Sequence, residues 1–237
     1  MRAPGGQRPT ASDPSRSCPF AWGEERLELL AEGAVLVPAS GLLLVADLHL
    51  GKAESFQAQG IPLPSDGDAA TLNVLLELVH RLHPASVLVL GDLIHSRLGL
   101  TPELRAKLRA LPELLGCGLR LIGGNHERGS WIEGLPQEPS QACGELWLSH
   151  EQEPRDGYLN VCGHRHPVAL VGQGNGRLRL PCFAYDEGRQ QLVLPAFGAL
   201  TGGHPCAAHE RLWLLADGAV VPWINPRPPA PGRRRRG

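Results

Sequence analysis

Long hydrophobic runs are absent from this 237-residue sequence. No apolar run approaches the roughly 18 residues that a membrane-spanning helix requires, so the sequence predicts no transmembrane helix and no membrane partner. The first residues pass into Pro, Ser and Thr without an apolar segment, which predicts that no secretory signal is present. The 42% hydrophobic and 20% charged residues are typical of a globular protein, and we expect a cytoplasmic one.

The sequence also has no excess of basic over acidic residues. The formal net charge is −1, and the segment 225–237 contains five arginines and no acidic residue, so residues 1–224 carry −6. A protein that held nucleic acid through a basic surface would show the opposite balance in its folded part. Chemistry on phosphate would therefore need a local positive charge, which points to a metal ion. The arginine run could itself contact nucleic acid, although such a run is more commonly a solvated chain end.

Paired cysteine motifs are absent as well. None of the six cysteines forms a Cys-x-x-Cys motif, and a chain of this length and leucine content does not need disulfides to fold. We expect reduced thiols that pack as small buried side chains rather than as metal ligands. The six positions are Cys18, Cys117, Cys143, Cys162, Cys182 and Cys206.

The length of the chain is that of one α/β domain, and no internal repeat is visible. Residues 1–20 are rich in Pro, Gly, Ser and Arg, and residues 225–237 are rich in Pro and Arg. Both compositions lack the large apolar residues that packing requires, so we expect disordered segments there. The predicted domain is residues 21–224.

The first half of this domain alternates apolar strands with helical patterns. Each predicted strand is a short apolar run, and each predicted helix begins at a capping Ser or Thr and ends near Pro or Gly. The predicted elements are strands 41–46, 87–90 and 119–122, a helix over 66–82 after Ser65, and a helix between Thr101 and Gly116. This βαβαβ order predicts a mostly parallel sheet covered by helices.

The second half contains shorter strand candidates separated by turns, at 145–148, 158–162, 192–194 and 211–215. We interpret them as a second sheet that packs on the first. The predicted fold class is therefore α/β, a two-sheet β-sandwich flanked by α-helices.

Five short polar blocks follow apolar strands in both halves. Any one of them alone would be typical of a turn, a helix cap or a buried, hydrogen-bonded histidine. Their repeated position matters more, because open α/β sheets place ligand sites at the carboxyl ends of their strands. The blocks are Asp47-Leu48-His49, Gly91-Asp92, Gly124-Asn125-His126-Glu127, Ser149-His150 and Gly163-His164-Arg165-His166.

The ligand types in these blocks point to divalent metal ions. They offer carboxylate and amide oxygens together with imidazole nitrogens and no thiolate, a set that suits Mn²⁺, Fe or Zn²⁺ better than a structural zinc site. Seven ligands are too many for one tetrahedral ion. They fit two ions about 3.5–4 Å apart that share one bridging carboxylate.

Together, the five blocks resemble the calcineurin-like metallophosphoesterases over nearly the whole predicted domain. The sequence is most similar to one bacterial family, the ligase-associated DNA damage response endonucleases called PdeM. That closer resemblance rests on segments 46–52, 60–64, 91–96 and 194–203. It implies a metallophosphoesterase fold and a phosphodiesterase that hydrolyses DNA as a single-strand endonuclease in repair. It also implies Mn²⁺ as the metal and functional association with a DNA ligase and a helicase.

The superfamily resemblance implies a role for each residue. Two groups of three side chains would each bind one ion: Asp47, His49 and His166 the first, and Asn125, His150 and His164 the second. Asp92 would bridge the two ions. His126 would act as the general acid that protonates the leaving oxygen after in-line attack by a metal-activated hydroxide, with a purely hydrogen-bonding His126 as the alternative. Two divalent ions, two aspartates and one hydroxide leave the centre at +1, which attracts a phosphodiester.

Weaker candidates lie beside these blocks. Lys52 and Arg165 could contact a substrate phosphate, although an exposed surface lysine and an orienting salt bridge explain them equally well. Glu127 stands where many members of the superfamily have Asp, and we expect little consequence because it follows the ligand block. Substrate would meet the loops 51–66 and 93–100, since little length remains for a separate capping domain. The other histidines are interpreted as structural, His95 and His204, or as surface residues, His80, His83 and His209.

Two alternatives stay open. The same centre could serve a small-molecule nucleotide phosphodiesterase or phosphatase, or the fold could be a non-catalytic scaffold in a repair complex. The scaffold is disfavoured because pseudoenzymes usually lose ligands, whereas every ligand position is filled here. A protein phosphatase is disfavoured because the loop after Gly91-Asp92 reads Leu-Ile-His-Ser and lacks the Asp-Arg-Gly of those enzymes.

Overall fold

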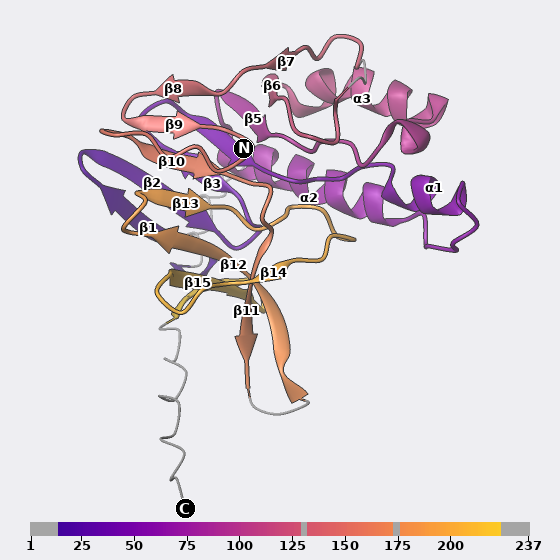
Figure 1. Cartoon of the computed structure of the whole chain (residues 1–237). Coiled ribbons are helices and arrows are strands. Elements are labelled where there is room, and N and C mark those ends of the chain that lie inside the picture. The colour runs from indigo at the N-terminus through magenta and orange to yellow at the C-terminus, as the bar shows by residue number, and fades with distance from the viewer. Residues whose placement is uncertain (1–13, 129–131, 173–175, 224–237) are drawn as a thin grey trace, which may run out of the picture.

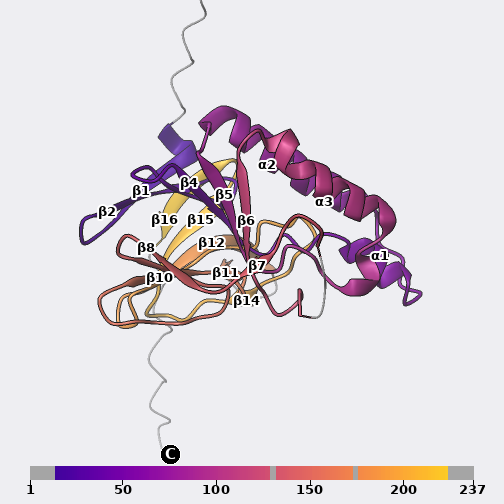
Figure 2. The ribbon, with the colours of Figure 1, turned by 90° about the horizontal axis from the view of Figure 1, so that it is seen from above.

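Two mixed β-sheets pack face to face, and two long α-helices cover the outer face of the first sheet (Figures 1 and 2). The computed structural model describes residues 14–128, 132–172 and 176–223. The predicted α/β fold class, a two-sheet sandwich with flanking helices, is confirmed. The layers therefore follow the order helices, first sheet, second sheet, and a third, short helix lies beyond the ends of the strands.

The first sheet contains seven strands in sequence order. Its first four strands are antiparallel, and from β4 onward neighbouring strands are parallel. The strands are β1 (Ser17–Trp22), β2 (Glu25–Leu30), β3 (Val35–Val37), β4 (Leu42–Val45), β5 (Ser86–Leu90), β6 (Gly118–Ile122) and β7 (Gln137–Glu138).

The predicted βαβαβ segment corresponds to β4, β5 and β6 with the two long helices between them. The second of these helices is capped as predicted, because the Thr101 side chain accepts a hydrogen bond from the Leu104 N–H and a left-handed Gly116 ends the helix. The first begins one residue later than predicted, since Asp66 rather than Ser65 precedes it. The helices are α1 (Lys52–Gln57), which the sequence analysis does not predict, α2 (Gly67–Leu82), α3 (Pro102–Leu115) and the 3-10 turns η1 (Pro14–Arg16) and η2 (Arg97–Gly99).

Side chains alternate along the central strands and so build two cores. On β4, Leu43 and Val45 pack against the helices, whereas Leu42 and Leu44 face the second sheet. All four are buried. Burial on both faces explains why the parallel strands read as continuous apolar runs in the sequence.

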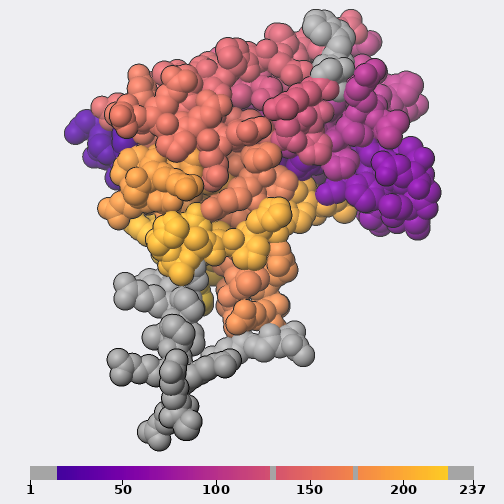
Figure 3. Space-filling view, in the orientation of Figure 1, coloured from indigo at the N-terminus to yellow at the C-terminus, as the bar shows by residue number. Residues whose placement is uncertain are grey.

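The second sheet also mixes parallel and antiparallel pairs. β10 is parallel to β9 and β13, and β12 is antiparallel to β11, β13 and β15. β11 and β12 form a hairpin that projects from the body of the protein (Figure 3). The strands are β8 (Gln141–Cys143), β9 (Leu146–Leu148), β10 (Leu159–Cys162), β11 (Pro167–Val171), β12 (Leu178–Asp186), β13 (Gln191–Val193), β14 (His204–Pro205), β15 (Arg211–Ala216) and β16 (Ala219–Trp223).

The N-terminal boundary of the domain differs from the prediction. Residues 17–20, which the sequence analysis placed in a disordered segment, belong to β1, which pairs with β2 along its length and buries Phe20. The composition of residues 1–20 hid this strand, because its order comes from pairing with a neighbouring strand. Residues 1–13 and the predicted disordered tail 225–237 lie outside the described residues.

Two further expectations can be compared with the fold. No described helix is both long enough and apolar enough to cross a membrane. All six cysteines are free. Only Cys162 and Cys182 are fully buried, and the other four are half-buried, so burial is less complete than predicted.

Candidate metal centre

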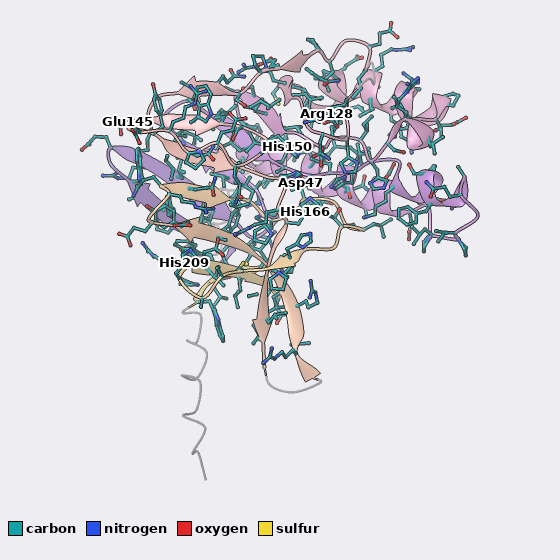
Figure 4. All side chains as sticks on the ribbon, in the orientation of Figure 1. Asp47, Arg128, Glu145, His150, His166 and His209 are labelled. Carbon is teal, nitrogen blue, oxygen red and sulfur yellow. The ribbon has the colours of Figure 1, made fainter. Side chains whose placement is uncertain are left out.

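The polar blocks of the sequence converge on one region of the sandwich. The three blocks of the first half follow β4, β5 and β6, and the two blocks of the second half follow β9 and β10. Each block therefore occupies the carboxyl end of a strand. Figure 4 places Asp47, His150 and His166 close together in the centre of the molecule. The side chains brought together are Asp47, His49, Asp92, Asn125, His150, His164 and His166.

Five of these seven residues have a left-handed backbone conformation. Their φ angles lie between 50° and 67°, a region that residues other than glycine rarely adopt. Only three other non-glycine residues in the described part of the chain share it. Strain of this kind concentrates at functional sites, where the surrounding structure holds it in place. The five are Asp47, His49, Asp92, His164 and His166.

The first cluster consists of Asp47, His49, Asp92 and His166, whose ligand atoms all lie within 4.8 Å of one another. The Nε2 atoms of His49 and His166 are 3.2 Å apart, and the His166 Nε2 is 3.3 Å from Asp47 Oδ1. Asp92 Oδ2 lies 3.8 Å from the His49 Nε2. Four potential ligand atoms therefore surround one point.

The second cluster shares Asp92 with the first. The His150 Nε2 lies 3.4 Å from Asp92 Oδ1, 3.1 Å from the His164 Nδ1 and 2.9 Å from Asn125 Oδ1. The two oxygens of Asp92 thus face different clusters, as a bridging ligand requires. The Leu90 carbonyl orients His150, because it accepts a hydrogen bond from Nδ1 at 2.9 Å and leaves Nε2 toward the cluster.

This donor set fits divalent cations. The nitrogens of two histidine pairs face each other at 3.1–3.2 Å, and Asp47 Oδ1 is buried without a hydrogen-bond partner among the described residues. Burial and the neighbouring histidines lower the pKa of His49 to about 2, so its ring is neutral and can act as a ligand. Burial raises the pKa of Asp92 above its usual value. A cation would satisfy both the facing imidazoles and the buried carboxylates.

His126 lies beside the first cluster with 31% of its side chain exposed. Its Nδ1 donates a short hydrogen bond to the His95 carbonyl oxygen, and its backbone N–H donates to Asp92 Oδ1 at 3.1 Å. Its Nε2 is 3.8 Å from Asp92 Oδ2. The ring is therefore held with Nε2 toward the cluster and is accessible to a substrate.

Glu127 has a larger part than the sequence analysis expected. Its side chain is fully buried, and its carboxylate accepts hydrogen bonds from the backbone N–H groups of Asp92, Gly124 and Ile94 at 2.9–3.0 Å. Burial raises the pKa of this carboxyl, and the N–H donors oppose that rise. Glu127 thus ties the loop after β5 to the loop after β6. The acidic residue was visible in the sequence, but its distant partners were not.

Of the two weaker substrate candidates, Arg165 is already engaged. Its Nη1 forms an ion pair with Glu210 Oε1 at 2.5 Å, and Glu210 is buried. This ion pair orients the guanidinium, whereas its Nε and Nη2 are buried without a hydrogen-bond partner among the described residues, so a contact with a substrate phosphate stays a prediction. Lys52 is half-buried at the start of α1, close enough to His49 to contribute to its lowered pKa, and it forms no ion pair within the described residues. Lys52 is therefore available for an anion.

Three histidines are exposed, as interpreted from the sequence: His80, His83 and His209. His204 is exposed too, and its backbone N–H donates to the His166 carbonyl at 2.9 Å. His95 lies closer to the site than the sequence indicated. Its ring stacks on His126 with centroids 5.1 Å apart, and burial lowers its pKa to about 4.

Glycines stand next to the ligands because a side chain would not fit there. A Cβ atom on Gly91 would lie 2.2 Å from the His150 Nδ1, and one on Gly163 would lie 2.6 Å from Asp47 Oδ2. Both distances are well inside van der Waals contact. The Gly-Asp and Gly-His pairs of the sequence thus reflect the close approach of loops from the two sheets.

The chain resembles known phosphoesterases in sequence and in fold. The family model of the calcineurin-like phosphoesterases matches residues 41–186. The crystal structure of the Pseudomonas putida nuclease MPE has a TM-score of 0.73 and 33% sequence identity, over 87% of this chain and all of that chain. Yfce, a phosphoesterase from E. coli, has a TM-score of 0.43 and 16% identity, over 78% of this chain and 99% of that chain. No curated protein matches the sequence.

Proposed function

Because this chain belongs to the calcineurin-like phosphoesterases, we propose that it is a metal-dependent phosphodiesterase that hydrolyses DNA, with single-stranded DNA as its substrate. The family match and the buried His/Asp centre make it a metallophosphoesterase. The observation that carries the proposal is that Asp92 belongs to two ligand clusters at once. DNA is proposed because a structural relative with 33% identity is a nuclease.

We propose that the site holds two divalent cations, with Mn²⁺ as the expected metal and Fe or Zn²⁺ suited to the same donors. Asp92 would be shared, and each ion would have three further ligands: Asp47, His49 and His166 for one, and Asn125, His150 and His164 for the other. When bound, the ions would supply positive charge and an activated water for attack on phosphorus.

The protein's own groups would position the substrate and transfer the proton. His126 would protonate the leaving oxygen from Nε2, because its Nδ1 is held by the His95 carbonyl. Lys52 would contact a phosphate oxygen, since its ammonium lies near the first cluster without an ion-pair partner in the described structure. Glu127 would keep the loop of Asp92 in place through its hydrogen bonds to the backbone.

Asp92→Ala is expected to abolish hydrolysis in the presence of Mn²⁺, because one carboxylate serves both clusters. Hydrolysis of bis-p-nitrophenyl phosphate and of a single-stranded oligonucleotide should be lost together, and metal analysis should show a lower metal content. Asp156→Ala is the matched control, since Asp156 is exposed before β10 and lies outside the loops expected to meet the substrate. Full activity of purified Asp92→Ala protein would contradict the dinuclear assignment.

His126→Ala is expected to lower kcat on DNA by about 10²–10⁴-fold, the range of a lost general acid, with the metal content unchanged. Bis-p-nitrophenyl phosphate should lose much less, because nitrophenolate leaves without protonation. A His126 that only forms hydrogen bonds would instead affect both substrates equally. His80→Ala, an exposed histidine on α2, is the control.

The acidic charge of residues 1–224 favours one alternative, a phosphodiesterase or phosphatase for small nucleotides. A side-by-side assay of p-nitrophenyl phosphate, bis-p-nitrophenyl phosphate and an unstructured oligonucleotide separates the two. Hydrolysis of a nitrophenyl ester without oligonucleotide cleavage would favour the small-nucleotide enzyme. No metal-dependent hydrolysis of any of the three would favour a non-catalytic scaffold.

The resemblance to the PdeM family adds an endonuclease role in DNA repair and an association with a DNA ligase and a helicase to the proposal. Mn²⁺-dependent cleavage of a closed circular single strand would support the endonuclease, because an exonuclease has no end at which to start. Cleavage of the linear strand alone would make the enzyme an exonuclease.

A further inference from the structure

The hairpin of β11 and β12 leaves the body of the protein directly beside the candidate metal centre. β11 begins at Pro167, the residue after His166, and the far end of the hairpin projects from the body of the protein (Figures 1 and 3). Residues 167–181 include Arg177 and Arg179 and no acidic residue. The hairpin is therefore a basic element of an otherwise acidic domain.

The two arginines lie at the start of the second strand of the hairpin. They flank Leu178, the first residue of β12, and both are exposed. The Arg179 guanidinium donates a hydrogen bond to the Gly203 carbonyl. The backbone N–H of the following residue, His204, donates a hydrogen bond to the His166 carbonyl at 2.9 Å. Arg179 therefore contacts the segment 203–204, which is itself hydrogen-bonded to the candidate metal ligand His166.

Arg177 and Arg179 are not paired with acidic residues. Neither has a carboxylate partner in the part of the chain that the structure describes. Two exposed arginines elsewhere are paired: Arg109 with Glu133 at 2.8 Å, and Arg189 with Asp186 at 3.8 Å. Although Arg179 also donates to the Gly203 carbonyl, the charges of both hairpin guanidinium groups remain available to an external anion.

The spacing of the arginines suits a nucleic-acid backbone. Arg179 pairs with Leu170, four residues after His166, which corresponds to about 13 Å along the strand. Arg177 lies two residues further, or about 7 Å. Successive phosphates of an extended single strand are separated by a comparable distance. A strand of a few nucleotides bound at the centre would therefore reach both guanidinium groups.

We propose that the β11–β12 hairpin binds phosphates of the single-stranded substrate and directs the strand toward the metal centre. This inference rests on the proposed function and adds to it a binding surface outside the centre. Concentrating positive charge on one projecting element is a physical means by which an acidic domain can hold a polyanion.

The test compares Arg177→Ala/Arg179→Ala with the parent protein in binding to a fluorescently labelled single-stranded oligonucleotide. Both proteins carry His126→Ala so that the strand survives the measurement, and anisotropy is recorded over a range of salt concentrations. Loss of two phosphate contacts is expected to weaken binding about tenfold and to reduce the slope of log Kd against log salt by about 1.4. Arg177→Lys/Arg179→Lys should keep the parent slope, because it keeps both charges.

Two controls separate this result from a general defect. Arg109→Ala/Arg189→Ala removes two exposed arginines elsewhere and should bind as the parent does. With His126 intact, the hairpin double variant should hydrolyse bis-p-nitrophenyl phosphate at the wild-type rate, which shows that the centre is folded.

The outcomes distinguish this inference from the proposed function. An unchanged affinity and salt slope in the hairpin variant, or no measurable binding by the parent protein, would overturn the role of the hairpin. Wild-type protein that hydrolyses the nitrophenyl diester and leaves the oligonucleotide intact would remove DNA as the substrate, whatever the binding experiment shows.

Discussion

Several candidate metal ligands have a strained, left-handed backbone conformation, which hydrogen bonds from neighbouring loops stabilise. Asp47 and His49 are left-handed, and their N–H groups donate to the carbonyls of Gly91 and Asp92 at 3.1 and 2.9 Å. The His164 N–H donates to Asp47 Oδ2 at 2.9 Å. Each ligand is thus positioned by bonds from another loop, which offsets a conformation that costs about 1–3 kcal/mol when unsupported.

Glu127→Gln is expected to lower the free energy of unfolding by about 1–3 kcal/mol. In the variant, the amide NH₂ would face a backbone N–H that donates to the carboxylate in the wild-type protein. Activity should fall as well, since the loop of Asp92 loses support. Chemical denaturation and the nitrophenyl diester assay measure the two effects. Glu133→Gln, at an exposed carboxylate, should change neither. A wild-type unfolding midpoint for Glu127→Gln would show that these hydrogen bonds are dispensable.

Among the secondary-structure elements, α1 and η2 are in close contact, and this contact joins the loop after β4 to the loop after β5. A Cβ atom on Gly99 in η2 would lie 1.9 Å from the Gly51 carbonyl oxygen, at the start of α1. The Ser55 and Ser96 hydroxyls hydrogen-bond across the same contact at 2.7 Å. This packing positions α1, and with it Lys52, beside the metal centre.

Gly99→Ala is expected to lower the free energy of unfolding by about 1–3 kcal/mol, because the added methyl group overlaps a backbone oxygen that has little room to move. Displacement of α1 should also raise KM for the oligonucleotide more than it lowers kcat for the nitrophenyl diester. Thermal unfolding and steady-state kinetics provide the measurements. Gly202→Ala is the control, since a Cβ atom there would meet nothing within 4 Å. Equal stability of the two variants would mean that η2 and α1 can separate without cost.

In the whole molecule, the first sheet is buried on both faces. The helices cover one face and the second sheet covers the other (Figure 2). Leu44 is fully buried in the core between the two sheets. Because ligands from both sheets must meet, this core sets the distance between the two halves of the metal centre.

Leu44→Ala is expected to cost about 3 kcal/mol of stability, which corresponds to a fall of about 6–12 °C in Tm for a domain of this size. Well below its Tm, the variant should still bind metal, because none of its ligands is changed. Calorimetry and metal analysis make the comparison, with Leu114→Ala as a control, since Leu114 is 63% exposed on α3. An unchanged Tm would argue against a tightly packed core between the sheets.

Much of the fold could be predicted from the sequence because its signals are local. Apolar runs, the Thr101 cap and Gly116 predict the βαβαβ order, and the structure contains it. Strand β1 could not be predicted, because its residues become ordered only by pairing with β2. Helix α1 is too short for a periodic apolar pattern to reveal it.

The chemistry of the candidate site follows from the sequence alone, because the sequence shows which oxygen and nitrogen donors exist and that they follow strands. The arrangement of these donors depends on the packing of the two sheets, because the centre joins loops more than a hundred residues apart, such as those of Asp47 and His164. Only the tertiary structure shows that Arg165 pairs with Glu210 and that Glu127 supports the loop of Asp92. Contacts between distant segments depend on how the sheets pack, which no local pattern records.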